Sequence, residues 1–137
     1  MNLSNIDCDK PLNFLCHDGT TVIRNDMPNT VTIDPTATME MARRISSEEG
    51  AWNFLKGDKG FMALFSCVYN AEAFRSMGAD IPLTDYPEGV QHITGLIVMV
   101  KEAQATGKRA FIRLPETYLH PRQQVGLGDL FISLSRV

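Results

Sequence analysis

The sequence predicts one α+β domain over residues 1–137, with strands near both ends of the chain and three to four helices between them. Alternating polar and apolar residues, the period of a strand, occur in both terminal regions, whereas the middle repeats apolar residues every three or four positions. A length of 137 residues, 44% of them hydrophobic, is typical of one compact globular domain. We expect the N-terminal and C-terminal strands to form an antiparallel sheet.

The N-terminal strands are predicted from turn chemistry and alternation. The segments LNFLC and TTVIR flank HDGT, in which Asp18-Gly19 tolerates the positive backbone angles of a tight hairpin turn. The segment TVTI, residues 30–33, alternates polar and apolar residues. We therefore expect a hairpin followed by a third strand over 30–33.

The first helix is predicted from its start signal. Asp34 is a good N-cap residue, and Pro35 suits the first helical position. Met39 and Ala42 follow at helical spacing. These features predict a helix that ends at about residue 45.

Two further helices are expected before residue 80. Ser46 and Glu49 have capping-box spacing and predict a helix over 46–57. The apolar segment 61–78 also fits one helix face, but its first part, 61–69, fits a buried strand as well. We favour the helix and leave the strand as an alternative.

The clearest helix is predicted over residues 87–106. Asp85 and Glu88 have capping-box spacing before it, and Gly107 suits its C-terminal end. One apolar stripe is expected to be buried, at Val90, Ile93, Ile97 and Val100. The polar residues between these positions are expected to be exposed, at Gln91, Lys101 and Gln104.

Two C-terminal strands complete the prediction. RAFIRL, residues 109–114, and LFISLS, residues 130–135, both alternate in side-chain character. Between them, residues 115–129 read as a long loop with two prolines and two glycines. No repeat, linker or low-complexity tract divides the chain, so we expect a single domain.

His92 and Thr94 form the His-x-Thr pattern that supplies half of the active site in two-histidine phosphoesterases. That site needs both side chains on one face, as on a strand, but residues two apart on an α-helix point about 200° from each other. No second His-x-Thr or His-x-Ser occurs in the chain. We therefore expect His92 to be a structural residue, partly buried or on a helix surface, and name no catalytic residue.

Metal and nucleophile signatures are weak. Cys8, Cys16 and His17 lack the two closely spaced ligand pairs typical of zinc sites, and Cys67 lies in an apolar segment that favours an inert thiol. No metal or other cofactor is expected. Three cysteines without tight spacing favour reduced thiols in a cytoplasmic protein, and we expect neither a signal peptide nor a membrane-spanning segment.

Charge is distributed unevenly along the chain. Residues 1–100 carry 13 acidic and 7 basic side chains, a net of −6, whereas residues 101–137 carry 3 acidic and 6 basic ones, a net of +3. A basic C-terminal third can attract an acidic partner. Ion pairs within the fold are the alternative explanation.

The candidate binding residues lie in this basic third. Arg109, Phe111 and Arg113 share one face of the strand predicted over 109–114. If that face is exposed, it suits a protein partner or a nucleic acid; if helices cover it, Phe111 is buried and the arginines reach outward. The following loop adds three residues of types that bind anions or anchor interfaces: Tyr118, His120 and Arg122.

We expect a small non-enzymatic binding or regulatory protein that acts through protein–protein contacts with a partner of acidic character. An inhibitor or adaptor of the kind that a virus or mobile element encodes fits the size and plain sequence. The alternative is a binder of nucleic acid or a nucleotide-like anion through the basic C-terminal third. An enzyme is the third choice, and the sequence leaves self-association open.

Overall fold

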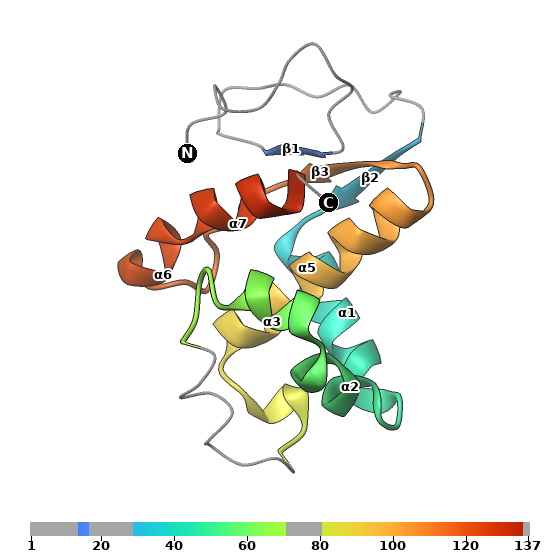
Figure 1. The fold of residues 1–137 in the computed structure, drawn as a ribbon, viewed down its shortest axis with the longest axis vertical. Coiled ribbons are helices and arrows are strands. Elements are labelled where there is room, and N and C mark those ends of the chain that lie inside the picture. Colours follow the sequence, from blue (N-terminus) through green and yellow to red (C-terminus); the bar gives the residue numbers. More distant parts are fainter. Residues whose placement is uncertain (1–13, 17–28, 71–80, 136–137) are drawn as a thin grey trace.

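The computed structural model describes residues 14–16, 29–70 and 81–135. Its strands form one parallel sheet in the order β1-β3-β2. The sheet lies at one end of the molecule, beside α5 and α7, while α2 and α3 lie toward the opposite end (Figure 1). The strands are β1 Phe14–Cys16, β2 Thr30–Ile33 and β3 Arg109–Ile112.

The predicted antiparallel sheet is wrong, because both described strand pairings are parallel. Parallel strands need a long crossover connection, usually helical. The chain between β2 and β3 supplies one, since it contains α1 and α5, which pack against each other. β3 therefore enters between β1 and β2 and runs in the same direction as both.

The N-terminal strands are found in part. The strand predicted over 30–33 is confirmed as β2, and β1 occupies the end of the first predicted hairpin arm. β1 pairs with β3 in the described structure. The Asp18-Gly19 turn and the second arm of the hairpin lie outside the described residues.

The second predicted C-terminal strand, 130–135, is also wrong, because these residues belong to helix α7, Leu127–Ser135. The segment alternates, but its apolar residues also fit a helical stripe, and the structure buries that stripe. A short apolar run satisfies both periods, and packing against neighbouring helices decides between them. The predicted loop 115–129 contains helix α6, Pro121–Val125, and the start of α7. The buried positions of α7 are Leu127, Leu130, Phe131 and Leu134.

Helix α1, Pro35–Ser47, begins as predicted. Asp34 is its N-cap, and the Asp34 carboxylate accepts a hydrogen bond from the Ala37 backbone N–H at 2.8 Å. The helix continues two residues beyond the predicted end at about 45. The residues at the start of α1 therefore predict its boundary more accurately than the residues at its end.

Helix α2, Ala51–Gly57, begins later than predicted. Ser46 still belongs to α1, and its hydroxyl lies 3.2 Å from the Thr84 hydroxyl instead of capping a new helix. The chain turns at Gly50, whose φ of 81° lies in the left-handed region that glycine adopts without strain. This turn separates α1 from α2 and sets the angle between them.

Helix α3, Lys59–Phe65, confirms the helical interpretation for the start of the segment 61–78. The Asp58 carboxylate caps it by accepting a hydrogen bond from the Phe61 N–H at 2.9 Å. Residues 71–78 of the predicted helix lie outside the described residues. A short 3-10 helix, η2 Leu83–Asp85, precedes the next long helix.

Helix α5, Glu88–Ala105, confirms the helix predicted over 87–106, and its predicted apolar stripe is buried. The predicted capping box is wrong, since the N-cap residue is Pro87. α5 has 18 residues, yet no helix within the described ranges is long and apolar enough to cross a membrane.

The predicted exposure of the polar residues on α5 is wrong. Gln91 is 7% exposed, and its amide donates to the Tyr86 carbonyl at 2.8 Å. Gln104 is half-buried and donates to the Leu134 carbonyl at 2.8 Å, and Lys101 is also half-buried. α5 contacts α1, α3, β2 and β3, so its N-terminal half is buried on every side.

The contact between α1 and α5 depends on a glycine. A Cβ atom at Gly95 would overlap the backbone carbonyl oxygen of Thr38. The absence of a side chain at Gly95 lets the two helix backbones approach closely. The core shared by these helices extends to the sheet through Ile33, Ala110 and Ile112.

Candidate docking surfaces

His92 is a buried hydrogen-bonding link between three parts of the chain. Its Nε2–H donates to the Pro115 carbonyl at 2.8 Å, because a carbonyl oxygen can only accept. Its Nδ1 lies 2.6 Å from the Thr38 hydroxyl, whose single hydrogen can be donated either to Nδ1 or to the Pro35 carbonyl oxygen 3.0 Å away. The ring therefore joins α1, α5 and the loop after β3.

The structure separates His92 from Thr94, as the helical spacing predicts. Both ring nitrogens of His92 are engaged by protein groups. The Thr94 hydroxyl is also buried but has no hydrogen-bond partner in the described part of the chain, so it shares no hydrogen bond with His92. His92 is more deeply buried, at 1% exposure, than the partly buried or surface position expected from the sequence.

Burial lowers the pKa of His92 below 6.5, although the Pro115 hydrogen bond and the Glu116 charge oppose this shift. The unfolded chain therefore binds this proton more readily than the folded protein. We expect the free energy of unfolding to fall as the pH drops from neutral through 6.5 and toward the lower pKa of the folded state. Urea denaturation at a series of pH values measures this dependence.

The matched variants for this pH prediction are His92→Gln and His120→Gln. His92→Gln should be less stable at neutral pH but should lose part of the pH dependence, whereas His120→Gln, at an exposed histidine, should keep it. The same pH dependence in wild type and His92→Gln would contradict the assignment.

The described residues contain no group of three or more His, Cys, Asp or Glu side chains able to hold a metal ion. Cys67 is half-buried, with its sulfur 3.6 Å from the Ala63 carbonyl oxygen. Cys16 lies on β1, and Cys8 and His17 lie outside the described residues.

The strand β3 divides the first three predicted binding residues. Arg109, the first residue of β3, and Arg113, which follows the strand, are exposed, but Phe111 is only 6% exposed. Phe111 stands apart from the core cluster that contains Ala110 and Ile112, so it belongs to the opposite face of the sheet. The alternative in which Phe111 is covered while the arginines remain accessible is the one observed.

The loop after β3 presents two apolar side chains in a strained backbone. Leu114 and Tyr118 have φ values of 51° and 67°, in the left-handed region that residues other than glycine rarely adopt. They are 46% and 45% exposed. The Tyr118 ring also packs edge-on against His92, with ring centroids 5.9 Å apart. One part of Tyr118 therefore covers the buried histidine while the rest faces solvent.

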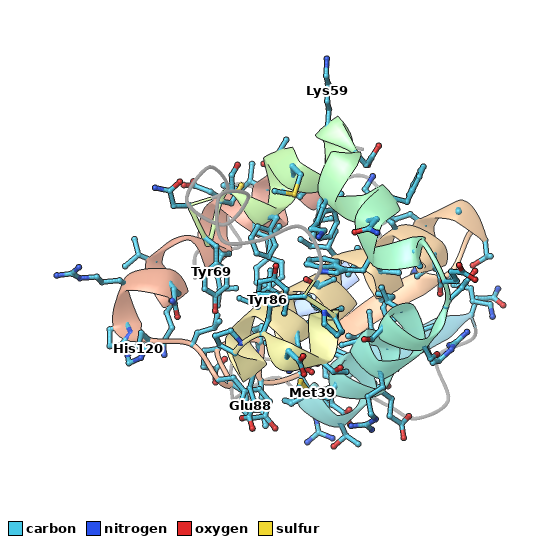
Figure 2. The ribbon with its side chains drawn as sticks, turned by 90° about the horizontal axis from the view of Figure 1, so that it is seen from below. Met39, Lys59, Tyr69, Tyr86, Glu88 and His120 are labelled. Carbon is cyan, nitrogen blue, oxygen red and sulfur yellow. The ribbon has the colours of Figure 1, made fainter. Side chains whose placement is uncertain are left out.

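The last two predicted residues belong to the start of α6. His120 precedes the helix and points outward, on the side of the molecule away from Lys59 (Figure 2). Its backbone N–H donates to the Gln123 side chain at 2.8 Å. Arg122 is exposed within the helix. Tyr118, His120 and Arg122 thus share one exposed segment.

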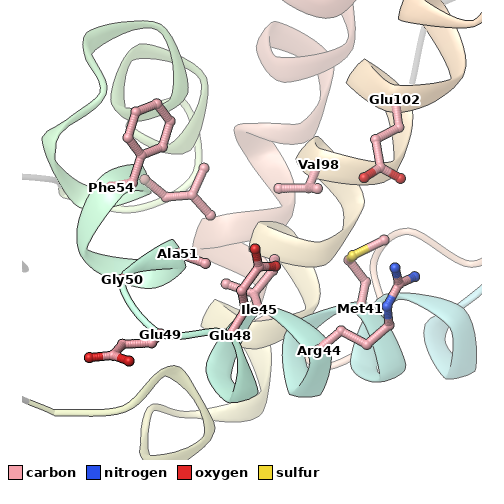
Figure 3. Close-up of a pocket in the computed structure, with 11 residues that line it drawn as sticks. Met41, Arg44, Ile45, Glu48, Glu49, Gly50, Ala51, Phe54, Val98 and Glu102 are labelled. Atoms are coloured by element: carbon pink, nitrogen blue, oxygen red, sulfur yellow. The ribbon is translucent and has the colours of Figure 1, made fainter.

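A groove that the sequence did not predict lies between α1, α2 and α5 (Figure 3). It has a volume of about 480 Å³, within the usual size range of ligand pockets. Met41 and Ile45, both 7% exposed, contribute apolar surface from α1. Leu55 of α2 and Val98 of α5 are half-buried on the other sides.

The edge of this groove combines an exposed aromatic ring with carboxylates. Phe54 is 72% exposed, although it is one of the largest apolar side chains in the protein. Three glutamates and one arginine complete the charged lining, and all four are exposed. The net charge of the lining is therefore negative, in contrast to the basic C-terminal third. These charged residues are Arg44, Glu48, Glu49 and Glu102.

No protein-family model, curated protein or solved structure matches this chain. The described architecture is a small parallel sheet beside α5, against which α1 and α3 pack.

Proposed function

We propose that the chain is a small non-enzymatic binding protein that acts through protein–protein contacts, in the manner of an inhibitor or adaptor. The surface that carries this proposal is the groove between α1, α2 and α5, which we call the acidic groove. Its apolar lining, flanked by charged side chains, has the composition of a protein-docking site.

The observation with the greatest weight is the exposure of Phe54. Burying an aromatic side chain contributes more to binding than burying most other residues. Phe54 extends from a wall whose neighbours, Ala51 and Leu55, already line the groove. A partner that fills the groove would cover the ring without rearranging the core.

We expect Phe54→Ser to weaken binding of the natural partner by roughly 30-fold or more, because exposed aromatic anchors are typical interface hot spots. Stability should change little, since the side chain is 72% exposed. The matched control is Val125→Ser on α6, where the side chain is 81% exposed and outside the groove. Proteins captured by wild type and by each variant are compared by quantitative mass spectrometry.

The expected result is a partner lost by Phe54→Ser and retained by Val125→Ser. Equal capture by all three proteins would contradict docking at the acidic groove.

A second candidate function is the binding of nucleic acid or a nucleotide-like anion through the basic C-terminal third. The exposure of Arg109, Arg113 and Arg122 favours it. The burial of Phe111 weakens it, because the ring is withdrawn from the stacking role expected for it. Tyr118, at 45% exposure, is the aromatic side chain left to stack on a base.

A further inference from the structure

The walls of the acidic groove come from three helices and from the turn between α1 and α2, which contributes Glu48, Glu49 and Gly50. α1 contributes Met41, Arg44 and Ile45, and α5 contributes Val98 and Glu102. These residues are three or four positions apart within each helix, so each set forms one stripe. None of the residues that line the groove belongs to a strand, and an amphipathic helix is a common occupant of an apolar groove between helices.

The length of the groove fits a short helical segment. From Met41 to Ile45 the α1 wall advances four residues, which is roughly 6 Å or one turn of helix, and Glu48 follows at the C-terminal end of α1. A partner helix presents apolar side chains at positions i, i+3 and i+4 over the same distance. Met41, Ile45 and Leu55 offer the apolar surface against which such a stripe packs.

The charges of the groove indicate which kind of helix fits. The lining has three glutamates and one arginine, so a helix that carries lysine or arginine beside its apolar stripe is favoured over an acidic one. Glu48 and Glu49 also border a second hollow of about 250 Å³ on the other side of the α1–α2 turn. Ile81 and Pro82 add apolar surface there. The turn between α1 and α2, which carries Glu48 and Glu49, therefore has apolar surface on both sides.

Resting on the proposed function, we infer that the partner docks through a basic amphipathic helix. Its apolar stripe lies along Met41 and Ile45 and covers Phe54. Its lysine or arginine side chains flank that stripe and pair with Glu48, Glu49 and Glu102. This occupant satisfies both the apolar lining and the excess negative charge of the groove.

Two synthetic peptides test the inference. Each has 15 residues with leucines at the same positions of an amphipathic helix; one has lysine at every remaining position, and the other has glutamate. Fluorescence anisotropy measures their binding to the full chain. We expect the lysine peptide to bind at least roughly tenfold more tightly, because several exposed charge pairs form with the glutamates.

The protein variants locate this preference. Glu48→Gln with Glu102→Gln should reduce the preference for the lysine peptide several-fold. The matched control, Asp85→Asn with Asp129→Asn, removes two exposed carboxylates outside the groove and should keep the preference. Equal loss in the two double variants would show a nonspecific effect of net charge and would overturn the inference.

Phe54→Ser separates this inference from the proposed function. If Phe54→Ser abolishes peptide binding and wild type shows no preference between the peptides, the groove still docks apolar segments but the basic class of partner is wrong. If Phe54→Ser leaves peptide binding unchanged, the acidic groove is not the docking surface and both proposals fail. Weakened binding of the lysine peptide, together with a preference that depends on Glu48 and Glu102, supports both.

Discussion

Replacement of Ile97 by alanine is expected to lower the free energy of unfolding by about 2–5 kcal/mol. Ile97 is fully buried on α5, in the part of the helix that is covered on every side. The substitution removes buried apolar surface and leaves a cavity that the surrounding elements can close only in part. The midpoint and slope of urea denaturation, monitored by circular dichroism, measure the loss.

Ile81→Ala is the matched control for Ile97→Ala. It deletes the same atoms from a side chain that is 38% exposed, so the expected loss of stability is much smaller. An unchanged urea midpoint in Ile97→Ala, or equal losses in both variants, would contradict the central position of α5.

Gly95→Ala is expected to destabilise the protein by about 1–3 kcal/mol, although alanine normally favours a helix over glycine. The added methyl group would overlap the Thr38 carbonyl oxygen, which is backbone and cannot rotate away. α1 and α5 must move apart to make room, and that movement disturbs the core around them. Thermal and urea denaturation measure the change.

Gly128→Ala in α7 tests whether the cause is the helix crossing. Apart from the adjacent residues and the backbone of its own helix, no described atom lies within 4 Å of a Cβ built at Gly128, so helix propensity alone should make this variant neutral or more stable by up to about 1 kcal/mol. Opposite signs for the two substitutions would support the close contact of α1 with α5. Stabilisation by Gly95→Ala would contradict it.

Local signals predicted the elements whose structure depends on nearby residues. The Asp34 cap, the strand over 30–33 and the buried stripe of α5 follow from short-range patterns, and all three are observed. Strand direction is not local information, because β2 and β3 find each other across the intervening helices. Residues 130–135 fit both a strand and a helix, and their surroundings decided for the helix.

The candidate sites, too, were predictable from the sequence only where they depend on nearby residues. Alternation placed Arg109, Phe111 and Arg113 on one face of the predicted strand; both arginines are exposed, yet alternation could not tell that Phe111 is covered. The acidic groove was missed because it forms where three helices meet, and its geometry depends on the turn at Gly50. Phe54 was a local signal of the groove, because it lies two positions from the buried Trp52 and therefore on a different side of α2.

The middle position of β3 has a consequence for how the protein is made. β1 and β2 both pair with β3, and Phe14 meets Ala110, 96 positions further along the chain (110 − 14). On the ribosome, neither strand can find this partner until residue 109 and those after it have emerged. Such distant pairings slow folding relative to a helical bundle of equal length. Strand edges that are still unpaired during this time favour aggregation. A chain that stops short of β3 would leave both strands without the partner they have here, so the synthesis of β3 is the step that completes the sheet.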